Sequence, residues 1–176
     1  MPDPFTQLLR DWQNFYLLTG TAAATLTGLM FVAASLGASL VTPATTTSVR
    51  TFVTPTIIHF SAVLITATLI TIPTETALLL SSLLGLGGLA GLSYTITTAL
   101  HLWRHHHQVP LAREDWFWHV GIPLMSYLLI LSTALGVLLS PLQALNGLAL
   151  AVIGLLVLGI RNAWDLTLWI AQQRQA

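Results

Sequence analysis

Five long apolar runs, separated by prolines, restrict the fold of this chain more than any other feature of its sequence. A helix needs about 20 mostly apolar residues to cross the roughly 30 Å of hydrocarbon in a bilayer. Inside lipid every backbone N–H and C=O group must find a partner within the protein, which favours helices for such runs. Hydrophobic residues make up 55% of the 176 residues and charged residues only 7%, against roughly 25% charged in soluble domains. The sequence therefore predicts an integral membrane protein.

Prolines between the apolar runs mark the connections between the predicted helices. These connections are short, so consecutive helices are expected to pack antiparallel. The predicted fold class is all-α: a polytopic membrane protein that forms a compact bundle of five transmembrane helices. Residues 1–176 make one transmembrane domain, which ends in an amphipathic cytoplasmic tail at 165–176. The predicted spans are about 15–41, 51–72, 76–101, 116–139 and 143–164.

Arginine, the only cationic residue apart from histidine, predicts the orientation. With five spans, the side of the N-terminus holds only Arg10, and the opposite side receives the other five arginines. Because short cytoplasmic loops are enriched in Arg and Lys, the five arginines place the N-terminus outside and the C-terminus inside a bacterial inner membrane. Five of the six tryptophans fall at the same inner boundary, where indole rings are favoured. The five arginines are Arg50, Arg104, Arg113, Arg161 and Arg174.

Composition and missing motifs argue against several classes of protein. The formal net charge is zero and no basic tract is present, so nucleic-acid binding is not expected. Cysteine is absent, which excludes disulfides, thiolate metal sites and thiol catalysis. The chain has no G-x-S-x-G, no H-E-x-x-H, no phosphate loop and no pair of carboxylates within a span. An enzyme is therefore not the expected class.

Histidines supply the most distinctive candidate site. Four of the six lie in "HLWRHHHQ", residues 101–108. His105–His107 fall in the predicted inner loop, where three adjacent imidazoles cannot all point to one side, and we interpret them as a weakly basic loop. His59, His101 and His119 instead lie on three different predicted helices, all toward the cytoplasmic half. Ionisable groups within a span usually face the bundle interior or a water-filled cavity, so these three are candidate ion, proton or metal ligands.

Two prolines inside the predicted spans lie close to these histidines. Pro55 is four residues before His59, and Pro123 is four residues after His119. A proline has no backbone N–H to donate to the carbonyl one turn earlier. The carbonyl of His119 is therefore expected to be unbonded beside its own imidazole, where it can hold water or a cation.

Polar residues on two other helices extend the candidate site. Tyr94, Thr98 and His101 share one face of the third predicted helix, at spacings of four and three. Arg161 and Asp165 form an i, i+4 pair on the fifth. One interpretation is an ion pair at the membrane interface, ahead of the amphipathic tail. The other turns the pair inward, where it joins the two intramembrane histidines in one cavity open to the cytoplasm.

Small residues on two predicted helices indicate close helix packing. Gly20, Ala24 and Gly28 lie at intervals of four on the first helix, and Gly87 and Gly91 on the third. Helices in lipid associate mainly through close packing, which small residues allow. Packing within one bundle must account for at least one of these faces, and two such faces favour a homo-oligomer.

The segments "DWQNFYLLTGTAAATLTGLMFVAASL" and "GIRNAWDL" resemble parts of small multi-span inner-membrane proteins of uncharacterised function in bacteria. The resemblance covers the first helix and the last. It implies a polytopic membrane protein and no particular activity.

Three interpretations of function are open at the level of sequence. The first is an oligomeric channel or small transporter, with the inner His/Tyr/Arg/Asp cluster as an ion site whose conduction depends on pH, because histidine changes charge near neutral pH. The second is a subunit that binds haem or a transition metal through His59, His101 and His119. The third is an accessory or structural subunit of a larger membrane complex.

Overall fold

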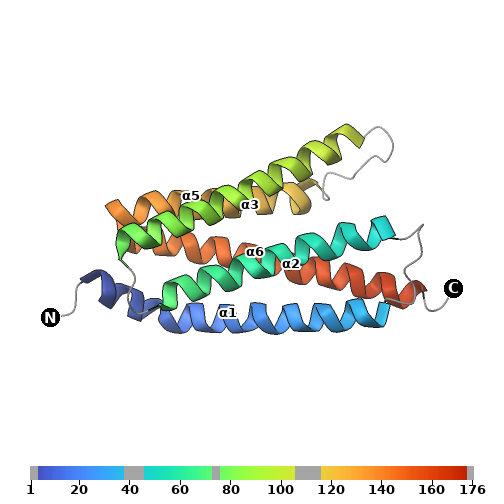
Figure 1. The fold of residues 1–176 in the computed structure, drawn as a ribbon, viewed down its shortest axis with the longest axis horizontal. Helices are drawn as coiled ribbons and strands as arrows, with labels where there is room; N and C mark the ends of the chain where they lie inside the picture. Colours follow the sequence, from blue (N-terminus) through green and yellow to red (C-terminus); the bar gives the residue numbers. More distant parts are fainter. Residues whose placement is uncertain (1–3, 38–45, 73–75, 106–115, 174–176) are drawn as a thin grey trace.

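The computed structural model describes residues 4–37, 46–72, 76–105 and 116–173 (Figure 1). These residues form long helices and, within those ranges, no strand. Each of the five membrane-length segments is long and apolar enough to cross a bilayer, so the predicted all-α bundle of five spans is confirmed. The elements are α1 (Pro4–Gly37), α2 (Thr46–Thr71), α3 (Ala77–His105), the π-helical turn η2 (Phe117–Gly121), α5 (Ile122–Leu139), which continues η2 in one span, and α6 (Pro141–Gln173).

The helices alternate in direction, and the start of α1 and the end of α6 lie at opposite ends of the bundle (Figure 1). α3 and α5 form one edge, α1 forms the other, and α2 and α6 lie between them. One expected contact is nearly missing: α2 and α3 follow each other in the chain, but α3 packs on α5 instead. A groove of about 350 Å³ with mainly apolar walls separates α2 from α3.

The core is formed by stripes of buried side chains that recur every three or four residues. α6 packs against α1, α2 and α5, and its Leu148, Val152 and Leu155 are fully buried. The outer faces carry large exposed apolar residues such as Leu18 and Phe31. Contiguous apolar surface of this kind is rare on soluble monomers. In a bilayer these faces contact the acyl chains.

The helices α1, α2, α3 and α6 are longer than the predicted spans, and the difference is largest for α1 and α6. α1 begins at Pro4 and α6 continues to Gln173. The 33 residues of α6 correspond to about 50 Å of helix, more than the hydrocarbon thickness. The expected amphipathic tail is, as far as residue 173, the unbroken end of α6. Its Leu166 and Ile170 are buried because they continue the apolar stripe of that helix.

The small-residue face of α1 divides between the bundle and the exterior. A Cβ atom built on Gly20 would lie 2.7 Å from the Cβ of Ala67, so this glycine allows α1 and α2 to approach closely. Gly28 has no side chain within 4 Å of such a Cβ, and Ala24 is exposed. Packing within one bundle therefore explains only part of this face.

Candidate functional site

His59 is the buried polar centre of the described part of the bundle. It lies on the inward stripe of α2 with Thr56, Phe60 and Val63, and is only 3% exposed. Its Nδ1 atom lies 3.2 Å from the hydroxyl of Tyr127 on α5. The apolar periodicity of α2 thus carries an imidazole into the protein interior and brings it to a hydrogen-bonding partner on another helix.

A cavity of about 60 Å³ adjoins His59. Its walls come from α2, α3, α6 and the η2–α5 segment, so four spans contribute to one small space. A cavity needs only about 10–15 Å³ to hold one water molecule, given polar partners. The lining residues are Pro55, His59, Tyr94, Thr95, Thr98, Leu102, His119, Pro123, Leu158 and Asn162.

Four of the predicted site residues line this cavity together. His59 comes from α2, Tyr94 and Thr98 come from α3, and His119 comes from η2. Tyr94 and Thr98 lie one turn apart, so the spacing noted in the sequence brings both to the same wall. Pro55 and Pro123, the prolines singled out beside the histidines, line the cavity as well.

The other three predicted site residues do not line the cavity. His101 is exposed near the end of α3. Arg161 is partly buried, and its guanidinium carbon lies 4.4 Å from the centroid of the Trp118 ring, in a cation–π arrangement. Asp165 is also partly buried. The inward turn that would bring the Arg161–Asp165 pair to the histidines is not what α6 adopts.

On α6, Asn162 lines the cavity in place of the predicted Arg161 and Asp165. It is 3% exposed, and its Oδ1 atom has no hydrogen-bond partner among the described residues. The signal that locates it is the buried stripe of Leu155, Leu158 and Leu166, whose spacing includes position 162. Arg161 is rotated by about 100° from that position, which directs it away from the stripe.

Tyr127 is the second site residue that the sequence analysis missed. It lies on the buried stripe of α5 one turn after Pro123, and only 1% of it is exposed. Its ring packs directly on Gly91 of α3, where any Cβ atom would collide with the ring. Gly87, one turn earlier on the same helix, has no such neighbour within 4 Å. Gly91 therefore makes room for the tyrosine that holds His59.

A π-helical turn positions His119. The amide of Ile122 donates a hydrogen bond to the carbonyl of Phe117, five residues earlier, and Pro123 follows directly. A π-turn contains one more residue than the corresponding α-turn, and such turns are frequent at functional sites. The predicted span at 116–139 was read as a plain α-helix, because a one-residue insertion leaves no mark in an apolar run. Pro55, in contrast, lies inside α2 without ending it.

No protein-family model, curated protein or solved structure matches this chain. Its function is therefore inferred from the bundle and the cavity.

The described residues do not provide a metal or haem site of the predicted kind. No group of three or more His, Cys, Asp and Glu side chains in the described ranges is arranged to hold a metal ion. Cofactor-sized ligands occupy pockets of roughly 300–1,000 Å³, so haem does not fit the cavity of about 60 Å³ between His59 and His119. The side chains of His105–His107 lie outside the described residues.

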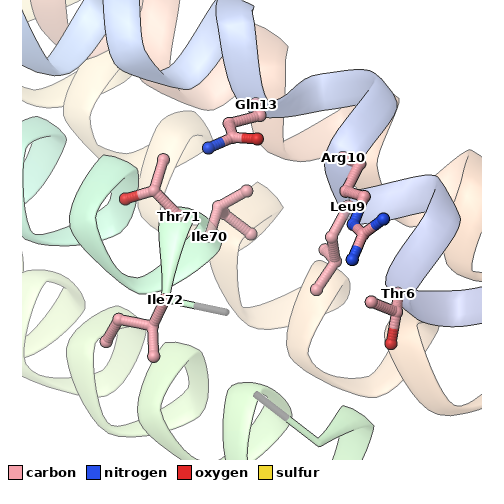
Figure 2. A pocket seen from close by; sticks show the side chains of 7 residues that line it. All are labelled: Thr6, Leu9, Arg10, Gln13, Ile70, Thr71 and Ile72. Atoms are coloured by element: carbon pink, nitrogen blue, oxygen red, sulfur yellow. The ribbon is translucent and has the colours of Figure 1, made fainter. Parts of the chain in front are cut away.

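A second cavity lies at the opposite end of the bundle, between the start of α1 and the end of α2 (Figure 2). It measures about 90 Å³, and Thr6, Arg10, Gln13 and Thr71 supply its polar side chains. Arg10 is exposed, and the four side chains lie at an end of the helices. This cavity lacks the buried polar groups of the first, so the cavity at His59 remains the candidate site.

Proposed function

We propose that the protein is a channel or small transporter whose transport site is the cavity beside His59. The supporting observation is that two imidazoles, a phenol, hydroxyls and an amide from four spans line one space. Polar and ionisable side chains are costly inside a membrane and commonly mark ion or substrate pathways. Helix packing alone does not require polar side chains from four spans around one cavity, so their presence supports a transport site.

The proposed orientation places the cavity in the cytoplasmic half of the bundle. The His59 cavity lies in the half of the bundle toward Leu102 and Arg104 of α3. The arginine distribution supports a cytoplasmic location for that end, in a bacterial inner membrane, with the N-terminus outside.

The proposed assembly is a homo-oligomer joined through the exposed part of the α1 small-residue face. Ala24 and Gly28 lie there with Thr21 and Thr25, whose hydroxyls bond to carbonyls of their own helix and leave the surface smooth. Such faces allow two helices to approach closely in lipid. Native mass spectrometry of the protein in lipid nanodiscs measures the number of subunits, and a strictly monomeric protein would contradict this assembly.

Ion flux in proteoliposomes tests the proposed function. The purified full-length protein is reconstituted, and the flux of H⁺, Na⁺ and K⁺ is measured between pH 5 and 8. We expect flux above that of empty liposomes, and a decrease of at least about tenfold in His59→Leu, because this change removes an ionisable group from the pathway. The dependence of flux on pH is expected to weaken in His59→Leu, because this variant lacks an imidazole that lines the cavity.

Two control variants remove histidines outside the cavity. His101→Leu makes the same substitution at an exposed position of α3, and the triple change of His105–His107 to glutamine removes the conspicuous cluster. Both are expected to retain flux. Wild-type protein that conducts no ion would refute the proposal and favour an accessory subunit of a larger membrane complex. Loss of flux in the triple variant would show that the loop histidines take part.

A further inference from the structure

The lining of the His59 cavity restricts what it can hold. None of the described residues that line it is acidic. A permanent cation would therefore lack a counter-charge in a medium where an unpaired charge is costly. The volume of about 60 Å³ suits about two water molecules, each of which occupies about 30 Å³ in the liquid. Small size favours water, and the mainly apolar walls include neutral polar side chains, among them Thr98 and Asn162, that can bond to it.

Asn162 provides an independent indication of a bound ligand. Its Oδ1 atom is buried, and no described residue donates a hydrogen bond to it. Buried polar atoms in proteins almost always have a partner, and an atom without a protein partner commonly marks a bound water or ion. An amide oxygen is satisfied by a hydrogen-bond donor such as water or by a cation, not by an anion, and the absence of acidic residues from the lining favours water over a cation.

The contact between His59 Nδ1 and Tyr127 leaves Nε2 of His59 available to accept a proton. Nδ1 of His59 lies 3.2 Å from the Tyr127 hydroxyl. When Nδ1 carries the proton and donates it to that hydroxyl, Nε2 keeps a free lone pair. Nε2 of His59 can then accept a proton. His119 lines the same cavity from η2, so a second imidazole is present there.

We propose that water in this cavity carries protons between His119 and His59, so that the proton is the ion handled at this site. This inference rests on the proposed transport function and names its ion. In the transfer, protonated His119 gives a proton from a ring nitrogen to water, and that water gives one of its own protons to Nε2 of His59. The positive charge moves from one imidazole to the other, and the water is regenerated.

The surroundings of His59 leave these two imidazoles as the proton carriers. Tyr127 contacts it from α5, and Tyr94 lines the cavity from α3; both phenols ionise only near pH 10 in water. Asn162, which α6 contributes, does not titrate. The charged group next to it, Arg161, stacks on Trp118 and is not part of the cavity lining.

Proton flux under a membrane potential tests the inference. Proteoliposomes that contain a pH-sensitive dye are energised with a K⁺ gradient and valinomycin. His59→Gln is expected to lower proton flux by at least about a hundredfold, as removal of a proton-transfer group does. Asn162→Leu fills the cavity and removes the amide, and about a tenfold decrease is expected, equivalent to one lost hydrogen bond. Where Asn162→Leu does not fold, Asn162→Ala removes the same amide without added volume.

The matched control is Asn146→Leu, the same change at an exposed position of the same helix. It is expected to retain proton flux within about twofold of wild type, since surface changes have small effects. Equal losses in Asn146→Leu and Asn162→Leu would overturn the role of the cavity.

Other outcomes separate this inference from the proposed function. Wild-type protein that conducts Na⁺ or K⁺ but not protons would overturn the inference and leave a transporter. Absence of all flux would overturn the proposed function and, with it, the relay. Water-edited solid-state NMR of ¹⁵N-histidine protein in lipid gives a readout without transport: a water contact is expected at the nitrogen signal that His59→Gln removes. Absence of a water contact at the His59 nitrogen would overturn the inference even if protons were conducted.

Discussion

Single positions on a helix decide which side chains reach the cavity. Asn162 lies on the buried stripe of α6, whereas Arg161 lies one residue away and contacts Trp118 instead. The sequence showed that polar residues gather in this part of α6. It did not show which of them faces inward, because charged and aromatic residues interrupt the apolar pattern there. His59 was easier to place, since Phe60 and Val63 define its stripe clearly.

Glycines that look alike in the sequence are expected to differ in their effect on stability. Gly91→Ala would drive a methyl group into the ring of Tyr127, which is held by the surrounding core, whereas Gly87→Ala meets nothing within 4 Å. We expect Gly91→Ala to lower the free energy of unfolding by about 1–3 kcal/mol, as overpacking does, and to lower flux through the displaced Tyr127. Gly87→Ala, on the same helix, is the control.

Unfolding in mixed micelles, followed by circular dichroism, measures this difference. Equal stability of the two alanine variants would show that Tyr127 does not pack on Gly91 as described.

Whole elements were predicted more accurately than their irregularities. Every predicted span corresponds to a helix, because apolar length alone identifies it. The extra residue in η2 was not predictable, since one inserted residue leaves the apolar character of the run unchanged. The sparse contact between α2 and α3 was also missed, because sequence order favours neighbours and the preference of α3 for α5 is a tertiary effect.

Deletion of Val120 tests the role of the π-turn. Removing one residue is expected to restore α-helical hydrogen bonding and to rotate His119 by about 100° relative to α5. The imidazole would leave the cavity, so flux should fall as far as in His119→Gln, a variant that lacks this imidazole, while the helix content by circular dichroism is unchanged. Deletion of Gln108, in the connection between α3 and η2, shortens the chain equally and should retain flux. A deletion variant as active as wild type would show that the π-turn is not required.

At the scale of the whole molecule, an odd number of spans separates the two termini. The described ends of the chain lie at opposite ends of the bundle (Figure 1). The sequence predicted this arrangement because five apolar runs can be counted directly. Which end faces the cytoplasm, and how many chains assemble, depend on loop charges and on other molecules, and the fold of one chain does not determine them.

Reporter fusions test the orientation. We expect a green fluorescent protein at the C-terminus to fluoresce and an alkaline phosphatase at the same position to be inactive, because five of the six arginines favour a cytoplasmic C-terminus. Arginines added at the N-terminal end, beside Arg10, are expected to increase the inverted population. An active C-terminal phosphatase would reverse the proposed orientation.

The groove between α2 and α3 makes the surrounding lipid part of the packed structure. A space of about 350 Å³ with mainly apolar walls does not stay empty in a bilayer, because unfilled volume forfeits dispersion contacts. In a bilayer we expect hydrocarbon tails to fill this space, as side chains do between the other helices. Tyr127 lines this groove and also bonds to His59, and Tyr94 lines both the groove and the His59 cavity. A change of surroundings from bilayer to detergent is therefore expected to affect the polar centre through these two tyrosines.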